Sequence, residues 1–102
     1  MNYYEEIVRH YSNGVKIVYE ILDNENIYIS SIISINKKQG RATESLNVFI
    51  KDFKDYNLFI FATNELGTNR EILYKWYKRL GFKEYNNIDY IPYNVTHAII
   101  NK

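Results

Sequence analysis

Alternation of hydrophobic and polar residues dominates the first third of the chain and predicts β-strands there. Over residues 15–22, apolar side chains recur at every second position, as on one face of a strand: Val15, Ile17, Tyr19 and Ile21. Residues 27–35 repeat the pattern, which predicts one shared face for Ile27, Ile29, Ser31, Ile33 and Ile35. Asn13-Gly14 and residues 23–26 are typical turn sequences. We therefore predict an antiparallel meander of two or three strands, in which residues 3–11 form either a strand or a short helix.

The spacing of apolar residues changes to a helical period at residue 42. One face of this predicted helix carries Ala42, Leu46, Phe49, Ile50 and Phe53. The helix should end near residue 55 or 56. A second helix is predicted over residues 70–80, with Gly81 as its C-terminal cap. Its inward side chains are predicted to be Ile72, Leu73, Trp76 and Leu80.

Shorter apolar runs predict the remaining strands. Residues 58–63 are typical of a central strand covered on both faces, residues 64–69 form a loop, and residues 82–85 and 95–100 are two further strands. The strands at 27–35 and 58–63 flank the first helix and should pair in parallel as a β–α–β unit. The predicted fold class is α/β (α+β), with a mixed, mostly antiparallel sheet of about five or six strands, a central parallel pair and two main helices.

Composition narrows the class of protein. The chain has 102 residues, which indicates a single domain over residues 1–102. Its net charge of +1 argues against a dedicated nucleic-acid-binding protein. It contains no cysteine, which excludes disulfides, thiolate catalysis and cysteine-based zinc sites and fits a cytoplasmic location. No apolar run reaches about 18 residues and the first residues lack the apolar core of a signal peptide, so we expect neither a membrane span nor secretion.

Codon usage explains part of the composition. Asn, Ile, Lys and Tyr are abundant in this chain and have AT-rich codons, which suggests a low-GC bacterium or a phage as the source. The same bias inflates the number of tyrosines, which is 11. A tyrosine by itself is therefore no indication of catalysis.

Residues 36–46, NKKQGRATESL, connect a predicted strand to the first predicted helix and carry candidate chemistry. The first N–H groups of a helix lack intrahelical partners and the helix dipole is positive at that end, so a glycine-bearing loop there can hold a phosphate. Gly40 would let the backbone approach the ligand, and Lys37, Lys38 and Arg41 would add positive charge. The alternative is an ordinary strand-to-helix turn with exposed charges.

Two short motifs, in this order, resemble the GNAT family of acetyl-CoA-dependent N-acetyltransferases. The family has a loop of the form Q/R-x-x-G-x-G/A between a strand and a helix, and here residues 37–42 read KKQGRA, with Lys37 in place of Gln or Arg. It also has a helix ending in Y-x-x-L-G-F, which residues 77–82, YKRLGF, match in full. A predicted strand at 58–63 separates the motifs, as the family requires, and the resemblance covers about residues 15–100.

The resemblance implies that the cofactor is acetyl-CoA. The backbone amides of residues 38–43 would bind its pyrophosphate, and the strand ending at Ile33–Ile35 would offer main-chain groups to its pantetheine arm. The implied cofactor-binding residues are Ile33, Ile35, Lys37, Lys38, Gln39, Gly40, Arg41, Ala42 and Thr43, with Asn69 near the place of a pantetheine-contacting asparagine of the family. No metal is implied.

The resemblance also implies catalytic residues. Tyr77 matches the tyrosine that often protonates the departing CoA thiolate, and a phenol suits this role because it stays protonated at neutral pH. The alternative for Tyr77 is a core aromatic residue beside Trp76. The strand at 27–35 has no carboxylate. Glu65 is therefore the nearest candidate base and Glu20 is another, and the alternative for each is an ordinary charged residue on the surface.

The resemblance leaves two functions open. Family members carry two helices ahead of the strand that matches residues 15–22, and we expect these helices to be missing here. The acceptor wall would then come from a partner subunit, as in a homodimer, or from the acceptor itself, so acetyl transfer to an amine on a protein is expected. The alternative is an inactive GNAT-like protein that binds another protein, for instance a phage or mobile-element inhibitor of a host factor.

Overall fold

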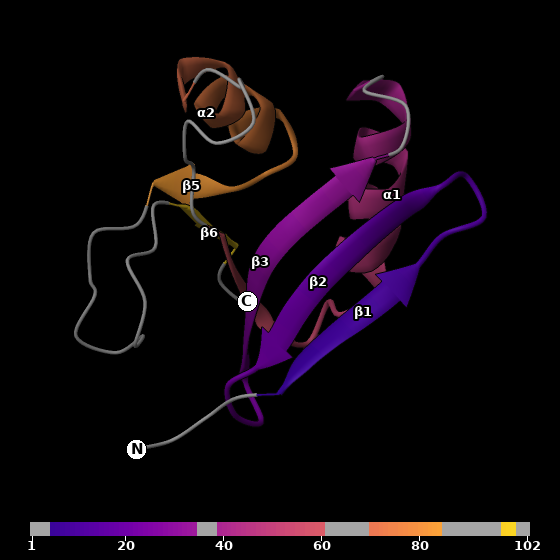
Figure 1. Cartoon of the computed structure of the whole chain (residues 1–102). Helices are drawn as coiled ribbons and strands as arrows, with labels where there is room; N and C mark the ends of the chain where they lie inside the picture. Colours follow the sequence, from indigo (N-terminus) through magenta and orange to yellow (C-terminus); the bar gives the residue numbers. More distant parts are fainter. Residues whose placement is uncertain (1–4, 35–38, 61–69, 85–96, 100–102) are drawn as a thin grey trace.

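The computed structural model describes residues 5–34, 39–60, 70–84 and 97–99, which form an α+β fold (Figure 1). The strands are β1 (Glu6–His10), β2 (Val15–Ile21), β3 (Asn26–Ser34), β4 (Asn57–Ile60), β5 (Lys83–Glu84) and β6 (His97–Ile99). The helices are α1 (Gln39–Asp52) and α2 (Arg70–Arg79). Neither of these described helices is long and apolar enough to cross a membrane.

The described strands make one mixed sheet in the order β1-β2-β3-β4-β6-β5. Strands β1, β2 and β3 form the predicted antiparallel meander, and the ambiguous first segment is a strand over residues 6–10. Strands β3 and β4 pair in parallel with α1 between them in the chain, which confirms the predicted β–α–β unit. Strand β6 is antiparallel to both β4 and β5. The predicted mixed sheet with a central parallel pair is therefore confirmed.

A β-bulge in β3 reverses which side chains in the second half of the strand face the helices. The β2–β3 register skips Ser30, which is an additional residue between Ile29 and Ser31. Before the bulge the alternation follows the prediction, and Ile29 is buried. After it, Ser31 and Ile33 lie on the opposite face, and Ile33 is 46% exposed. The predicted single face for residues 27–35 is wrong, because hydrophobic alternation does not reveal an inserted residue.

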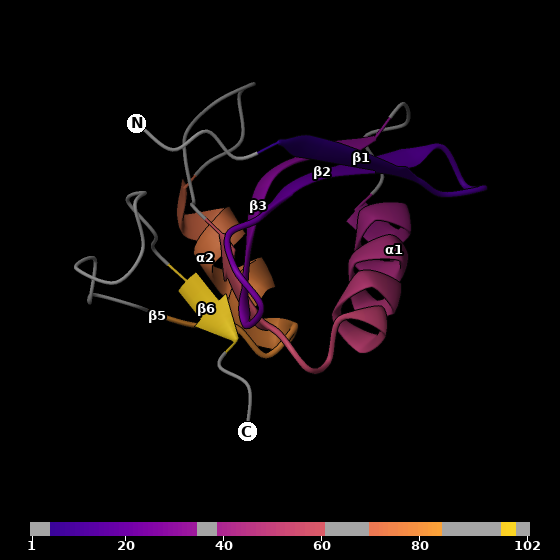
Figure 2. The ribbon, with the colours of Figure 1, turned by 90° about the horizontal axis from the view of Figure 1, so that it is seen from below.

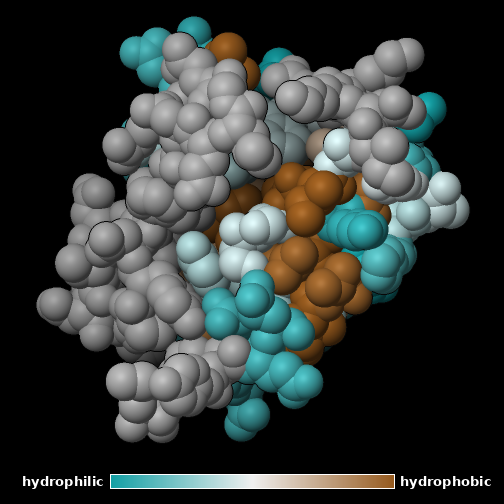
Figure 3. Space-filling model, in the orientation of Figure 1, coloured by the Kyte–Doolittle hydropathy of each residue, from teal (hydrophilic) through white to brown (hydrophobic). Residues whose placement is uncertain are grey.

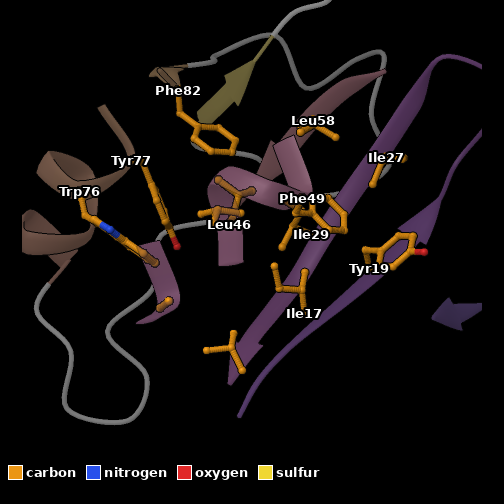
Figure 4. Close-up of a cluster of buried hydrophobic side chains, with 13 residues drawn as sticks. Ile17, Tyr19, Ile27, Ile29, Leu46, Phe49, Leu58, Trp76, Tyr77 and Phe82 are labelled. Carbon is orange, nitrogen blue, oxygen red and sulfur yellow. The ribbon is translucent and has the colours of Figure 1, made fainter. Parts of the chain in front are cut away.

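Both helices lie on the same side of the sheet (Figure 2). Their inward side chains join those of the sheet in one buried cluster (Figure 4), which contains Val15, Ile17, Tyr19, Ile27, Ile29, Ala42, Leu46, Phe49, Leu58, Ile60, Trp76, Tyr77 and Phe82. The ring of Phe49 meets that of Tyr19 edge to face, with 5.0 Å between centroids. The predicted inward face of the first helix is confirmed, since Ala42, Leu46 and Phe49 are all buried.

The carboxyl end of α2 is closed by a Schellman motif. The Phe82 N–H donates to the Tyr77 carbonyl (2.9 Å) and the Gly81 N–H donates to the Lys78 carbonyl (3.1 Å). Gly81 has φ 102°, a backbone conformation that side chains with a Cβ rarely adopt. The predicted glycine cap is therefore confirmed.

The inward face of α2 differs from the prediction at one position. Trp76 and Tyr77 are buried, and Leu73 and Leu80 pack against the same cluster. These residues follow the spacing i, i+3, i+4 and i+7, which forms one stripe on a helix. Ile72 precedes this stripe and is 48% exposed, so its predicted inward position is wrong.

Candidate functional site

Most of the described residues of the predicted phosphate loop lie at the amino end of α1. The helix begins at Gln39, earlier than the predicted start at residue 42, so Gln39, Gly40 and Arg41 belong to its first turn and not to a preceding loop. This turn contains no acidic residue, and Arg41 is exposed. Because the first N–H groups of a helix lack intrahelical acceptors and the dipole is positive there, this end of α1 can attract an anion.

Gly40 is exposed within this first turn. A Cβ atom at this position would meet no described atom within 4 Å outside its own helix backbone and chain neighbours. The described glycines with positive φ are Gly14 and Gly81, and Gly40 is not one of them. The fold therefore does not require glycine at position 40, and its presence leaves the approach to the first N–H groups of α1 unobstructed.

The tip of the β1–β2 hairpin holds the beginning of α1 from one side. The Asn13 Nδ2 group donates to the Ser45 hydroxyl (2.9 Å) and to the Arg41 carbonyl (3.3 Å). The Asn13 Oδ1 atom accepts from the Val15 N–H (3.2 Å), which orients the amide within the hairpin. Ser45 is fully buried, so this contact satisfies a polar group inside the core. Asn13 thereby fixes the beginning of α1 against the sheet.

Helix α2 holds the beginning of α1 from another side. The Trp76 Nε1–H donates to the Thr43 hydroxyl over 2.7 Å, and the Trp76 ring is buried in the core. The Thr43 hydroxyl thus has a structural role. Ala42 is also buried in the core cluster. Because α1 begins at Gln39, the N–H groups of Ala42 and Thr43 bond within the helix, and the free N–H groups of the first turn are those of residues 39–41.

Strand β3, which precedes α1 in the chain, extends past its parallel register with β4. In the described residues this register runs from Asn26↔Asn57 to Ile29↔Ile60, whereas β3 continues to Ser34. The bulge at Ser30 lies where the described register ends. Bulges are frequent beside functional sites because they change the direction of side chains and end regular pairing.

Tyr77 points inward from α2 into an aromatic part of the core (Figure 4). It is 4% exposed, and its ring centroid lies 5.5 Å from that of Trp76, 5.7 Å from Phe82 and 5.4 Å from His97. Burial raises the pKa of the Tyr77 phenol, and the neighbouring Tyr28 adds to the rise. The phenol therefore stays protonated at neutral pH, as a core side chain that can still donate a hydrogen bond.

Several predicted site residues do not lie at the amino end of α1. The side chain of Ile33 is on the sheet face opposite the helices, so its predicted main-chain contact with a ligand stays a prediction. Glu20 lies on β2 on that same face, where it is buried. The remaining predicted residues fall outside the described part of the chain: Ile35, Lys37, Lys38, Glu65 and Asn69, together with the side chain of Gln39. The candidate base Glu65 thus stays a prediction.

Sequence reasoning missed three side chains that hold this site: Asn13, Ser45 and Trp76. The pair Asn13-Gly14 predicts a tight turn but not a contact with a helix. Ser45 could be found from the sequence, because it is a polar residue at an inward-facing position of an otherwise apolar helix face. Trp76 is predicted to face inward, but the partner of its N–H depends on how the two helices pack.

A shallow hollow of about 390 Å³ lies on the outer side of α2, lined by Ile72, Lys75, Lys78 and Arg79. Tyr77 faces into the core instead, so this hollow is separate from the candidate site. Within the ranges that the structure describes, no group of three or more His, Asp or Glu side chains is placed to hold a metal ion.

Comparison of the chain with family models, with curated proteins and with solved structures finds no match. The candidate site therefore rests on the residues and contacts around the amino end of α1.

Proposed function

We propose that this protein binds acetyl-CoA at the amino end of α1 and transfers the acetyl group to an amine on a protein. The observation that carries the proposal is the first turn of α1, which has no acidic residue, leaves Gly40 open, and is held in place by Asn13 and Trp76. The resemblance of residues 37–42 and 77–82 to GNAT motifs supports this assignment.

The arrangement of the elements supports a GNAT-like domain. The resemblance implies a central parallel pair with antiparallel strands on either side, and β3 and β4 are such a pair. Helix α1 follows β3 and helix α2 follows β4. These are the places that the resemblance gives to the pyrophosphate-binding helix and to the helix with the catalytic tyrosine.

The chain's own groups at the amino end of α1 fit a pyrophosphate. Its first N–H groups can donate to phosphate oxygens, and hydrogen bonds to a charged group contribute about 1.5–3 kcal/mol each. The exposed Arg41 adds charge, and no carboxylate in the first turn opposes it. Asn13 and Trp76 hold the beginning of α1 before a ligand binds, which lowers the cost of ordering this turn.

Tyr77 supports the transfer reaction as a hydrogen-bond donor. Acetyl-CoA supplies an activated thioester: the amine nitrogen bonds to the carbonyl carbon and loses a proton to solvent, and the C–S bond breaks to release a thiolate. The pKa of Tyr77 is raised by burial, so complete proton transfer from this phenol to a thiolate is uphill. We therefore expect the Tyr77 phenol to stabilise the thiolate by a hydrogen bond, while solvent supplies the proton.

Isothermal titration calorimetry with CoA and with acetyl-CoA tests the binding site. We expect dissociation constants in the micromolar range for the natural sequence. Gly40→Glu should abolish binding, because its carboxylate would repel the phosphates and occupy the space over the first turn. Val48→Glu is the matched control, since Val48 is exposed on the same helix beyond this turn and the change in net charge is equal.

Two results would exclude this function. The first is no heat of binding with either nucleotide at roughly 300 µM. The second is equal binding by Gly40→Glu and by the natural sequence, which would place any CoA site elsewhere on the molecule.

A second candidate function is protein binding without catalysis. The observation in its favour is the position of Tyr77, which is buried among aromatic rings as an ordinary core residue would be. Capture of a partner from a bacterial lysate, followed by mass spectrometry for acetyl-lysine, separates the two. A captured partner that carries no acetyl group, together with absent CoA binding, would favour the second function.

A further inference from the structure

The sheet face that α1 and α2 leave uncovered carries an exposed apolar patch, seen as the brown area over β1–β3 in Figure 3. Val8 is 47% exposed and Ile33 is 46% exposed. Val8 pairs across the strands with Val18, which is half-buried on the same face. Apolar side chains of this kind are stabilised when they leave water, and contiguous apolar patches mark interaction sites.

The exposed Glu6 lies at one end of this patch and the exposed Lys16 at the other, so the two ends carry opposite charge. At one end Glu6 faces Glu20 across β1 and β2, and at the other end His10 faces Lys16. Glu6 and Lys16 are both exposed. Val8 lies midway between the two pairs along β1, so the acidic and basic ends are roughly 13 Å apart at the usual rise of a strand.

This distribution of charge is complementary to itself. A second copy can pack its same face on this one about a two-fold axis that crosses the strands at Val8. The acidic end of each copy then lies over the basic end of the other, so Glu6 approaches Lys16 of the second copy. A two-fold axis parallel to the strands would instead bring acidic end to acidic end, which like-charge repulsion disfavours. The charges therefore select one of the two symmetric arrangements.

The apolar residues agree with the same axis. Val8 lies on the axis and would meet Val8 of the second copy. On β3, Ile33 pairs with Lys16 and Tyr28 pairs with Glu20, so these two β3 residues lie at opposite ends of the patch. The two-fold rotation places Ile33 over Tyr28 of the second copy, and an aliphatic side chain packs well on an aromatic ring.

We propose that the face formed by Val8, Val18, Ile33, Glu6 and Lys16 is a two-fold interface between two copies of this chain. The interface is isologous, so each copy covers the apolar patch of the other and the assembly closes as a dimer. The inference does not depend on acetyl transfer, because it uses only the sheet face opposite both helices.

Sedimentation velocity of the whole chain tests this interface. We expect a dimer at about 50 µM, which corresponds to a dissociation constant in the micromolar range. Val8→Glu places two carboxylates at the two-fold axis and should raise the dimer dissociation constant at least about tenfold. Val8 is exposed on an edge strand, so the fold should survive, and a circular-dichroism unfolding curve verifies this.

A charge swap tests the pairing itself. Glu6→Lys alone and Lys16→Glu alone should each weaken the dimer by about threefold or more, whereas the double variant should restore it, because the ends become complementary again. The matched control exchanges Lys78 and Glu84, an exposed ion pair on α2 and β5 (3.9 Å), and should leave association unchanged.

Three results would overturn the proposal. A natural chain that remains monomeric at roughly 200 µM would leave this face to a different protein. A folded Val8→Glu variant that dimerises like the natural chain would place the interface elsewhere. A double charge swap that is as weak as the single variants would rule out the proposed axis.

Discussion

The Trp76 indole N–H donates to the Thr43 hydroxyl over 2.7 Å, and this bond joins α2 to the beginning of α1. Residues far apart in the chain thereby set the position of the proposed anion site. Trp76→Phe should lower the free energy of unfolding by about 2 kcal/mol, since it removes a hydrogen bond and some buried surface. Thr43→Val should cost about 1 kcal/mol, because it removes the acceptor and keeps the side-chain shape.

Urea unfolding of both single variants and of the double variant measures the coupling between Trp76 and Thr43. The double variant should be more stable than the sum of the single costs predicts, by about 0.5 kcal/mol or more. Strict additivity would mean that this hydrogen bond contributes nothing to stability.

Asn13→Ala should weaken both the fold and the proposed ligand site. It removes the donor to Ser45 and Arg41 and leaves the buried Ser45 hydroxyl without this partner, at a cost of about 1–2 kcal/mol. Because the beginning of α1 is then less firmly held, the affinity for CoA should fall about three- to tenfold. Unfolding curves and calorimetry check the two effects. An unchanged affinity in a destabilised variant would separate Asn13 from the ligand site.

Tyr77→Phe should lower turnover about tenfold and leave the affinity for CoA nearly unchanged, because the ring stays and only the donor is lost. Release of free thiol from acetyl-CoA, with poly-lysine as the amine acceptor, measures the rate. Tyr74→Phe is the matched control, since Tyr74 is a half-buried tyrosine of the same helix. Full activity of the Tyr77→Phe protein would remove this residue from the reaction.

Alanine substitutions of two glycines should change stability in opposite directions. Gly81 has φ 102°, so Gly81→Ala forces a Cβ into an unfavourable backbone conformation and should cost about 1–2 kcal/mol. Gly40 is helical, and a Cβ there meets open space, so Gly40→Ala should raise stability by up to about 1 kcal/mol. Thermal or urea unfolding of the two variants is the measurement. A loss of stability in Gly40→Ala would mean that position 40 needs glycine.

The Asp23 carboxylate should make folding stability depend on pH in the acid range. Its pKa is held below the usual value by the hydrogen bond from the Asn26 side chain and then by that from the Glu25 N–H (2.7 Å). A pKa that is lower in the folded state stabilises the fold at pH values above the unfolded pKa of about 3.9. This stabilisation is lost as the pH falls through the pKa of the folded state. The contribution is small, because Asp23 is exposed and solvent screens its charge.

Comparison of the natural sequence with Asp23→Asn by urea unfolding at about pH 7 and pH 3 tests this pH dependence. The natural sequence should be the more stable of the two at pH 7, and the difference should be smaller at pH 3, because the pH then approaches the lowered pKa of Asp23. Asp23→Ala should be less stable at both values, because it removes the acceptor altogether. A difference between the natural sequence and Asp23→Asn that does not change with pH would contradict this role of the charge.

Local periodicity determined most of the secondary structure from sequence alone. Alternation at Val15, Ile17 and Tyr19 identified β2, and helical spacing at Ala42, Leu46 and Phe49 identified the inward face of α1. These patterns are readable because one face of each element is buried, so the sequence repeats with the period of the backbone. The order of the elements then implied the parallel pairing of β3 and β4.

Tertiary structure decided what no local pattern contains. The bulge at Ser30 moves Ile33 to the face opposite the helices, because one additional residue reverses the alternation that follows it. The bonds from Asn13 to Ser45 and from Trp76 to Thr43 join residues of different elements. Such contacts depend on how strands and helices pack in space. The sequence by itself predicted a phosphate site at the beginning of α1, and the packing determined which side chains hold that part of the helix.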